Sequence, residues 1–165
     1  MKPRPGSEIS VRRLTAADIE DAGEILFDAF NKVFARHGYP PPIPDIASGQ
    51  ALAQAYHGYE PTGCFVAVAN GTVVGSAFLH RRGDRAGVGP VTVAPAFQGH
   101  GVGRRLMIRV IDEVADCASI RLYQDAFNRE SFALYARLGF EARGVMAILR
   151  AQPPRITARG EPGLR

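Results

Sequence analysis

The chain has no tryptophan, only two cysteines and no apolar run near the length of a membrane-spanning helix. Such a helix needs about 20 apolar residues, so the sequence predicts no association with a membrane. Cys64 and Cys117 lie far apart and lack the Cys-x-x-Cys or Cys/His spacing of a zinc site. We therefore expect no bound metal, and a chain of this size needs no disulfide bond to fold.

Lysine is also scarce, because only Lys2 and Lys32 are present and arginine supplies almost all of the net charge of +4. The arginines are scattered, without the long basic run or the interleaved aromatic residues typical of nucleic-acid-binding proteins. We therefore predict no nucleic-acid partner and favour an anionic small molecule as the ligand. The basic N-terminal stretch is not followed by the apolar segment of a secretory signal, which predicts a cytoplasmic protein.

The length of 165 residues suits one folded domain with a single core. We expect a flexible leader over residues 1–8, one domain over residues 9–150, and a disordered basic tail rich in proline and glycine over residues 151–165. Hydrophobic periodicity and turn residues predict the elements of the domain. The expected strands are Ile9–Leu14, Cys64–Ala69, 72–80, Val88–Ala94, Ser119–Gln124, and one or two short strands across Glu141–Arg150.

The expected helices run over about 16–35, from the proline-rich loop 37–45 to about Tyr56, over 99–117, and over Asn128–Leu138. Thr15 and Asn128 are placed to cap the first and last of them, and Gly139 is placed to end the last. Asn70-Gly71 predicts a two-residue hairpin turn. Hairpin strands followed by a strand–helix–strand crossover predict an α+β, or mixed α/β, fold.

The segment FQGHGVGRRLM, residues 97–107, sets three glycines at the head of the most regular predicted helix. The first N–H groups of a helix have no acceptor within the helix, and glycine lets an anion approach them closely. Arg104 and Arg105 would add outer positive charge. The spacing does not fit a dinucleotide-binding turn, and the Gly-Lys-Ser/Thr of a phosphate-loop NTPase is absent. A flexible helix entry without a ligand is the alternative.

Two motifs resemble those of the GNAT superfamily of N-acyltransferases. The first is Val93, Pro95, Gln98, Gly101 and Gly103, which match Val-x-Pro-x-x-Gln-x-x-Gly-x-Gly. The second is Asn128, Ser131, Tyr135, Gly139 and Phe140, which resemble the later acyl-CoA motif. The resemblance implies a mostly antiparallel sheet of six to seven strands, splayed at the strand before the glycine turn and flanked by about four helices.

The resemblance also implies acetyl-CoA as cosubstrate and an N-acetyltransferase that transfers acetyl to a primary amine by direct attack. Gly89 and Pro90 favour incomplete pairing of their strand, which would leave backbone free for the pantetheine arm. The implied cofactor-binding residues are Val91, Thr92, Val93, Gln98, Gly99, His100, Gly101, Val102, Gly103, Arg104, Asn128 and Ser131.

The resemblance implies that Tyr135 lies beside the CoA sulfur and acts as general acid toward the thiolate, since a phenol keeps its proton at neutral pH. An aromatic residue of the helix face, with Phe132 and Leu138 as core neighbours, is the alternative. The general base is less defined, since GVGPVTV contains no carboxylate. Asp125 is the nearest acidic candidate, and Glu60, Asp84, His80 and His37 are others. The missing carboxylate supports an alternative, a catalytically silent acyl-CoA-binding regulatory module.

The acceptor is expected to bind beside the first helix and the loop after it, where the family builds its acceptor groove. The residues proposed for its wall are Phe30, Phe34, His37 and Tyr39. A small-molecule amine, an amino acid and a protein amine all remain open as acceptors. The short final segment also allows a homodimer in which another subunit completes the sheet.

Overall fold

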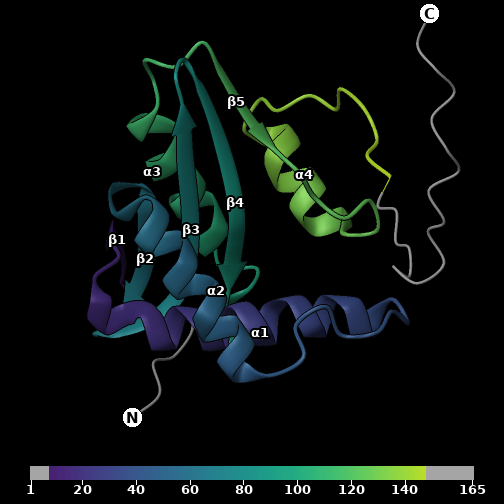
Figure 1. Ribbon diagram of the computed structural model, residues 1–165. Helices are drawn as coiled ribbons and strands as arrows, with labels where there is room; N and C mark the ends of the chain where they lie inside the picture. The colour runs from purple at the N-terminus through teal and green to yellow at the C-terminus, as the bar shows by residue number, and fades with distance from the viewer. Residues whose placement is uncertain (1–7, 148–165) are drawn as a thin grey trace, which may run out of the picture.

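A five-stranded sheet forms the centre of residues 8–147, the part of the chain that the computed structural model describes. Four strands are antiparallel neighbours and the last pairs in parallel with the fourth (Figure 1). The mixed α/β class and the mostly antiparallel sheet are confirmed. The strands, in their order across the sheet, are β1 (Ile9–Arg13), β2 (Cys64–Ala69), β3 (Thr72–Arg82), β4 (Arg85–Val93) and β5 (Ser119–Leu122).

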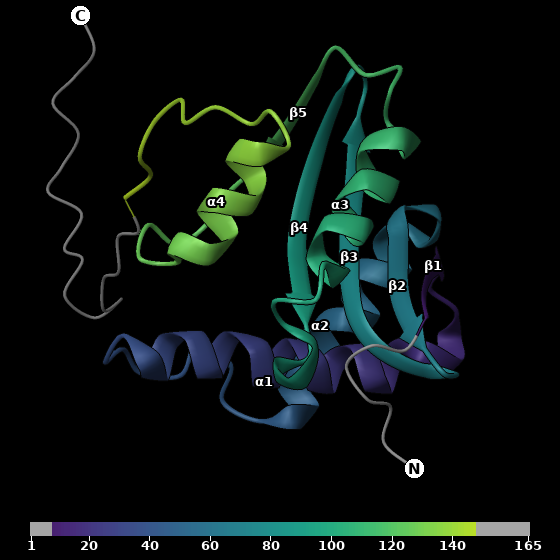
Figure 2. The same ribbon diagram turned by 180° about the vertical axis from the view of Figure 1, so that it is seen from behind.

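Helices cover both faces of this sheet. The helices are α1 (Ile19–Arg36), α2 (Ile46–Tyr59), α3 (Val102–Glu113) and α4 (Arg129–Arg137). Helices α1 and α2 pack together on one face, while α3 lies across the other (Figures 1 and 2). Each face therefore has its own core, one around Leu106 and Val110 of α3 and one around Leu26 of α1 and Phe78 of β3. Helix α4 follows β5 at the edge of the sheet (Figure 1).

The hairpin between β2 and β3 has the predicted turn. Asn70 and Gly71 have φ angles of 49° and 79°, the left-handed conformation that a two-residue turn of this kind requires at both positions. A second hairpin, with Gly83 at a φ of 62°, joins β3 to β4. Strand β4 therefore begins at Arg85, three residues earlier than the periodicity predicts.

Both predicted ends of helix α3 are wrong. Helix α3 begins at Val102 rather than at Gly99, because Gly99 and Gly101 have left-handed φ angles that an α-helix excludes. It ends at Glu113 rather than near Cys117, and the chain then turns so that the Ala118 N–H donates to the Asp84 carbonyl at 2.7 Å.

Within residues 8–147 the sheet has five strands, fewer than the predicted six to seven. Residues 141–147 form no strand, and Val145 is 97% exposed. A strand needs a partner for its ladder hydrogen bonds, so the apolar composition of this segment does not by itself make it a strand. Residues 148–150, the predicted tail 151–165 and most of the predicted leader lie outside the described residues.

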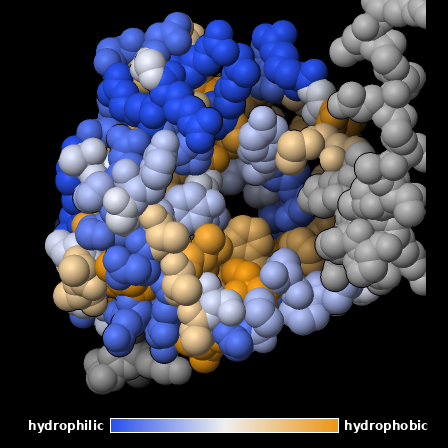
Figure 3. Space-filling model, in the orientation of Figure 1, coloured by the Kyte–Doolittle hydropathy of each residue, from blue (hydrophilic) through white to orange (hydrophobic). Residues whose placement is uncertain are grey.

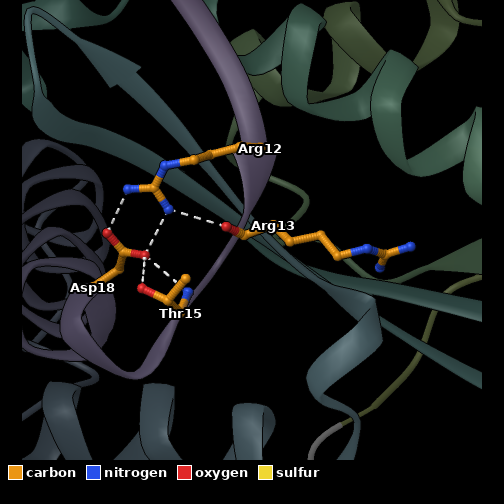
Figure 4. A network of polar contacts seen from close by, with 4 residues as sticks. All are labelled: Arg12, Arg13, Thr15 and Asp18. Atoms are coloured by element: carbon orange, nitrogen blue, oxygen red, sulfur yellow. Dashed lines mark hydrogen bonds and ion pairs between the residues drawn. The ribbon is translucent and has the colours of Figure 1, made fainter.

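An ionic cluster fixes the start of α1 against β1 (Figure 4). The buried Asp18 carboxylate accepts two hydrogen bonds of 2.7 Å from the Arg12 guanidinium. It also accepts from the Thr15 N–H and hydroxyl, at 2.8 and 2.7 Å. The Arg12 hydrogen bonds, followed by those from Thr15, hold the pKa of Asp18 far below its usual range. Thr15 is the N-cap of the short 3-10 helix Ala16–Asp18 that leads into α1, so it caps the start of the helical segment as the sequence predicts.

Asp18→Asn should lower the free energy of unfolding by about 2 kcal/mol, because charge-assisted hydrogen bonds are the stronger kind and Arg12 loses its partner. Chemical denaturation at neutral pH measures the loss. Since folding depresses the pKa of Asp18, the wild-type advantage is present above about pH 4 and declines as the pH falls below that value. Asp28→Asn, at an exposed position of α1, is the control, and an equal loss in both variants would contradict the role of the cluster.

Neither a metal site nor a membrane span is found within residues 8–147. No three His, Cys, Asp or Glu side chains of the described chain come together as metal ligands. None of the described helices has both the length and the apolar character needed to cross a membrane. Both cysteines are free, and Cys64 is buried.

Candidate active site

Strands β4 and β5 pair over only part of their length. The ladder joins Arg85–Val88 to Ser119–Leu122 and stops there. From Gly89 to Val93, no described strand pairs with β4 on that side, although β3 still pairs with Val91–Val93 on the other. The β3–β4 register shifts beside Gly89 and Pro90, where proline offers no N–H to a ladder. In Figure 1, β5 diverges from β4 toward α4.

The glycine turn opens the first turn of α3 toward free space. Gly99 and Gly101 have φ angles of 79° and 77°, and a Cβ atom added at either would meet no atom within 4 Å. The first helical hydrogen bond runs from the Arg105 N–H to the Gly101 carbonyl at 3.1 Å. The N–H groups of the three preceding residues therefore have no acceptor inside the helix. An anion placed at this turn would meet several donors at the positive end of the helix dipole.

Side chains attach this turn to its neighbours. Gln98 Nε2 donates to the Val93 carbonyl of β4 at 3.1 Å, so this carbonyl is occupied. His100 Nδ1 lies 2.8 Å from the Gln98 carbonyl. A Cβ atom on Gly103 would lie 3.3 Å from Leu134 Cδ2 of α4. The turn is thus held between the end of β4 and α4.

The two arginines that follow the glycines, Arg104 and Arg105, differ in their contacts. Arg104 is exposed and makes no hydrogen bond or ion pair with the described part of the chain, as an outer charge for an anion would. Arg105 instead donates from Nη1 to the Ile9 carbonyl at 3.0 Å. Its predicted role as a second outer charge is wrong, because this hydrogen bond directs its guanidinium to β1.

The other predicted cofactor residues have partners within the chain. Asn128 Oδ1 accepts from the Ser131 N–H at 3.3 Å, so Asn128 caps α4 as predicted. Ser131 Oγ donates to Gln124 Oε1 at 2.7 Å. The Thr92 hydroxyl is buried 2.8 Å from Ser76 Oγ, and the Val102 side chain is buried in the core. Neither side chain is therefore available to a cosubstrate. The Thr92 main chain also faces β3, because antiparallel pairing alternates from the Ala94 N–H bond to the Val74 carbonyl, whereas the Val102 N–H has no acceptor inside the helix.

Tyr135 lies on α4, beside the core that also contacts Val91 and Val93. Its ring packs edge-on against Phe140, with the ring centroids 6.0 Å apart. Burial raises the pKa of the Tyr135 phenol to about 12. The hydroxyl therefore keeps its proton throughout the neutral range and has an O–H to donate there.

A cavity of about 450 Å³ lies on the α1 and α2 side of the β4–β5 junction. In Figure 3 the face seen in Figure 1 is hollowed near its centre, and apolar side chains gather along the lower part of the hollow. This volume is within the range of small-molecule sites. One wall consists of Phe30 of α1, Pro42 and Ile43 of the loop after it, and Leu52 and Tyr56 of α2. The opposite wall consists of His80, residues 87–90, Arg121 and Leu122 of the sheet, with Tyr123 just after β5.

Sequence comparison decides the family of this chain. The family described as "Acetyltransferase (GNAT) family" matches residues 22–140. The chain belongs to the GNAT family of acetyltransferases. This assignment confirms the resemblance drawn from the two motifs, both of which lie inside the matched range.

Individual GNAT relatives agree with this assignment. An uncharacterized protein of Mycobacterium leprae is 31% identical over 145 residues, which cover 83% of this chain and 36% of the relative. The N-alpha-acetyltransferase RimI of Mycobacterium tuberculosis is 29% identical over 141 residues, which cover 83% of this chain and 81% of the relative. The chain spans less than half of the length of several curated relatives that it matches.

A solved structure shows that the GNAT fold is shared. The PaiA N-acetyltransferase from Thermoplasma acidophilum, crystallised in complex with coenzyme A, has a TM-score of 0.71 at 17% identity. The superposition covers 84% of this chain and 93% of the other. At this identity the likeness concerns the fold alone.

The structure separates the four residues proposed for the acceptor wall of this GNAT domain. Phe30 lines the cavity. Phe34, His37 and Tyr39 are instead gathered around Phe127, with ring centroids 5.1, 5.0 and 4.7 Å from its ring. These three are not among the lining residues. They join the end of α1 to the segment between β5 and α4, a contact between distant parts of the sequence.

The base candidates are separated in the same way, and only His80 lines the cavity. Glu60 Oε2 accepts from the Arg81 N–H at 2.9 Å, and Asp84 lies in the β3–β4 turn, 3.8 Å from Arg85. Asp125 follows β5, where its carbonyl accepts from the Asn128 N–H at 2.9 Å. His37, at the end of α1, contacts Phe127.

Arg121 and Tyr56 are cavity residues that the sequence does not single out. Arg121 pairs with Gly87 in the β4–β5 ladder, and Gly87 pairs with His80 in the β3–β4 ladder. One row across three strands thus brings His80 and Arg121 to the same cavity. Neither residue belongs to a motif, so only strand register could have indicated their proximity.

Proposed function

We propose that this GNAT chain transfers an acetyl group from acetyl-CoA to a primary amine. The observation that carries the proposal is the adjacency of two features: the glycine turn at the start of α3, and the β4 edge that β5 leaves unpaired. The relative from Thermoplasma acidophilum binds coenzyme A on the same fold. The cavity on the other side of the β4–β5 junction then becomes the acceptor site.

The residues present suit the cosubstrate. The unpaired N–H groups of Val102, Gly103 and Arg104 would bind the pyrophosphate, with the Arg104 guanidinium outside them. The open space in front of Gly101 leaves room for phosphate oxygens. The main-chain groups of Val91 and the N–H of Val93 face away from β3, because antiparallel pairing alternates along β4, and they would bind the pantetheine amides. Gln98 supports this edge through its hydrogen bond to Val93, and Asn128 and Ser131 fix the first turn of α4.

We assign the proton acceptor to His80, ahead of Asp125. An amine is protonated at neutral pH and must lose a proton before its nitrogen can attack a thioester carbon. Imidazole exchanges protons in the neutral range, and the His80 ring lies in the cavity wall beside the unpaired part of β4. Asp125 does not line the cavity, so it would need a water molecule to reach the amine.

Tyr135 is the group proposed to act on the departing sulfur. As the new C–N bond forms and the C–S bond breaks, negative charge collects on sulfur, and the phenol can donate to it. With its pKa raised to about 12, Tyr135 gives up its proton less readily than a free phenol. Its contribution is therefore a hydrogen bond that strengthens as the thiolate forms, with proton transfer only as the sulfur leaves.

Two measurements together test the function. Calorimetry should show saturable binding of acetyl-CoA, and a free-thiol assay with a panel of amines should show amine-dependent release of coenzyme A. A catalytically silent regulatory module would bind the cosubstrate and release no thiol with any amine. Failure of both measurements would remove the proposed function.

Gly87→Ala tests the role of His80 without changing His80 itself. An added Cβ atom would lie 2.4 Å from His80 Nε2, so the imidazole must move away. We expect kcat to fall about 100-fold, close to the effect of His80→Gln, since a positioned base contributes roughly that much. Acetyl-CoA affinity should stay the same.

Gly144→Ala is the matched control, because an added Cβ atom there meets no atom within 4 Å. Asp125→Asn is measured beside it. If Gly87→Ala and His80→Gln retained full activity while Asp125→Asn lost it, the base would be Asp125 and the assignment to His80 would be wrong.

A further inference from the structure

The lining of the acceptor cavity includes basic side chains but no acidic ones. Arg121 and His80 line it, together with two phenols, and no aspartate or glutamate is among the lining residues. The Arg121 guanidinium makes no hydrogen bond or ion pair with any described residue, and its side chain is exposed. An arginine without a partner beside a binding cavity is suited to a carboxylate, which it can bind with two parallel hydrogen bonds.

The row His80–Gly87–Arg121 sets the spacing between base and cation. Neighbouring strands lie about 4.8 Å apart, so the backbones of the first and last residue are roughly 10 Å apart. Gly87, between them, has no side chain, and the His80 ring occupies the space above it. The imidazole therefore extends toward β5, and the long Arg121 side chain can cover the rest. A ligand with its amine and its carboxylate close together fits this arrangement.

The remaining wall is apolar and aromatic. Phe30 and Ile43 come from the α1 side, Tyr56 from α2, and Tyr123 from the rim after β5. Such a surface accepts the body of a hydrophobic molecule, and the volume of about 450 Å³ suits a small molecule rather than a long peptide. A polyamine or an aminoglycoside would bring several positive charges to Arg121, with no carboxylate in the lining to compensate them.

We propose that the acceptor is a small primary amine with a carboxylate near the amine and an apolar or aromatic body, as in a hydrophobic α-amino acid. This proposal rests on the acetyltransferase function. Arg121 binds the carboxylate, His80 takes a proton from the ammonium, and the apolar wall holds the body. The amine nitrogen then bonds to the acetyl carbon as the C–S bond of the thioester breaks.

The test compares phenylalanine with phenylalaninamide, spermidine and a tripeptide that begins with phenylalanine, by free-thiol release. We expect kcat/KM to be at least tenfold higher for phenylalanine than for its amide. Arg121→Gln should abolish that preference, and Arg121→Glu should reverse it in favour of the amide. Arg82→Gln, which changes an arginine outside the cavity lining, should keep the wild-type preference.

Preference for spermidine or the tripeptide, or a preference for phenylalanine that survives in Arg121→Glu, would overturn the proposal while leaving the acetyltransferase function intact. If acetyl-CoA binds but no amine releases thiol, ligand-observed NMR binding of phenylalanine and its amide to wild type and Arg121→Glu decides. Tighter binding of phenylalanine than of its amide by wild type, reversed in Arg121→Glu, would support the carboxylate site. Equal binding of the two ligands would contradict it.

Discussion

Gly101→Glu is expected to weaken acetyl-CoA binding by at least 100-fold in calorimetry while the protein stays folded. The glutamate carboxylate would lie at the helix start where the pyrophosphate is proposed to bind, so repulsion replaces hydrogen bonding with N–H groups. No atom lies within 4 Å of the added Cβ position, so the substitution causes no steric clash. The φ of 77° costs about 1–2 kcal/mol for a non-glycine residue, which the fold should tolerate.

Two variants separate charge from backbone strain. Gly101→Asn places a neutral residue that adopts the left-handed conformation more readily, and its loss of affinity should be far smaller. Gly71→Glu carries the same charge and a similar φ of 79° in the distant β2–β3 hairpin. It should bind acetyl-CoA as the wild type does. Unchanged affinity in Gly101→Glu would show that the pyrophosphate lies elsewhere.

Tyr135→Phe should reduce kcat by about 100-fold with little change in KM for acetyl-CoA, since the lost hydrogen bond forms mainly as the thiolate develops. Rates from steady-state thiol release measure this split. Because the pKa of Tyr135 is raised to about 12, the wild-type rate should show no loss from phenol ionisation below about pH 11. Tyr59→Phe, at a residue 65% exposed and outside the cavity, is the control.

The burial of Tyr135 can also be tested through the pH dependence of the free energy of unfolding. Folding raises the pKa of Tyr135, so its ionisation destabilises the fold as the pH rises from about 10, the ordinary phenol value, toward 12. The free energy of unfolding of wild type should therefore fall more steeply over this range than that of Tyr135→Phe. Cys64, with a pKa raised to about 11 by burial, contributes equally to both. Equal slopes together with an unchanged kcat would contradict the proposed position of Tyr135.

Local patterns were sufficient to predict most elements of the fold. Cys64–Ala69 is a strand with the predicted boundaries, and Asn70-Gly71 forms the predicted turn. The α3 boundary was wrong because apolar periodicity continues across Gly99 and Gly101, whose left-handed φ angles depend on the turn. The strand predicted across Glu141–Arg150 is absent from residues 141–147, because a strand needs a neighbouring strand, which composition cannot supply.

The two halves of the candidate site also differed in how far the sequence could predict them. The cosubstrate half lies in continuous motifs around Gly101 and Tyr135, so the sequence could indicate it. The cavity proposed as the acceptor half is assembled from α1, α2, the loop between them and three strands. Of its lining residues, the sequence had named Phe30 for the acceptor wall and His80 as a candidate base. The structure instead packs Phe34, His37 and Tyr39 against Phe127, outside the cavity lining. These contacts join residues about 90 positions apart in the sequence, so local patterns could not indicate them.

By itself, the sequence determined the family and the glycine-rich start of α3, because each depends on residues a few positions apart. Only the tertiary structure placed His80, Gly87 and Arg121 in one row. Strand register decides which side chains meet across a sheet, and register depends on how distant strands pair.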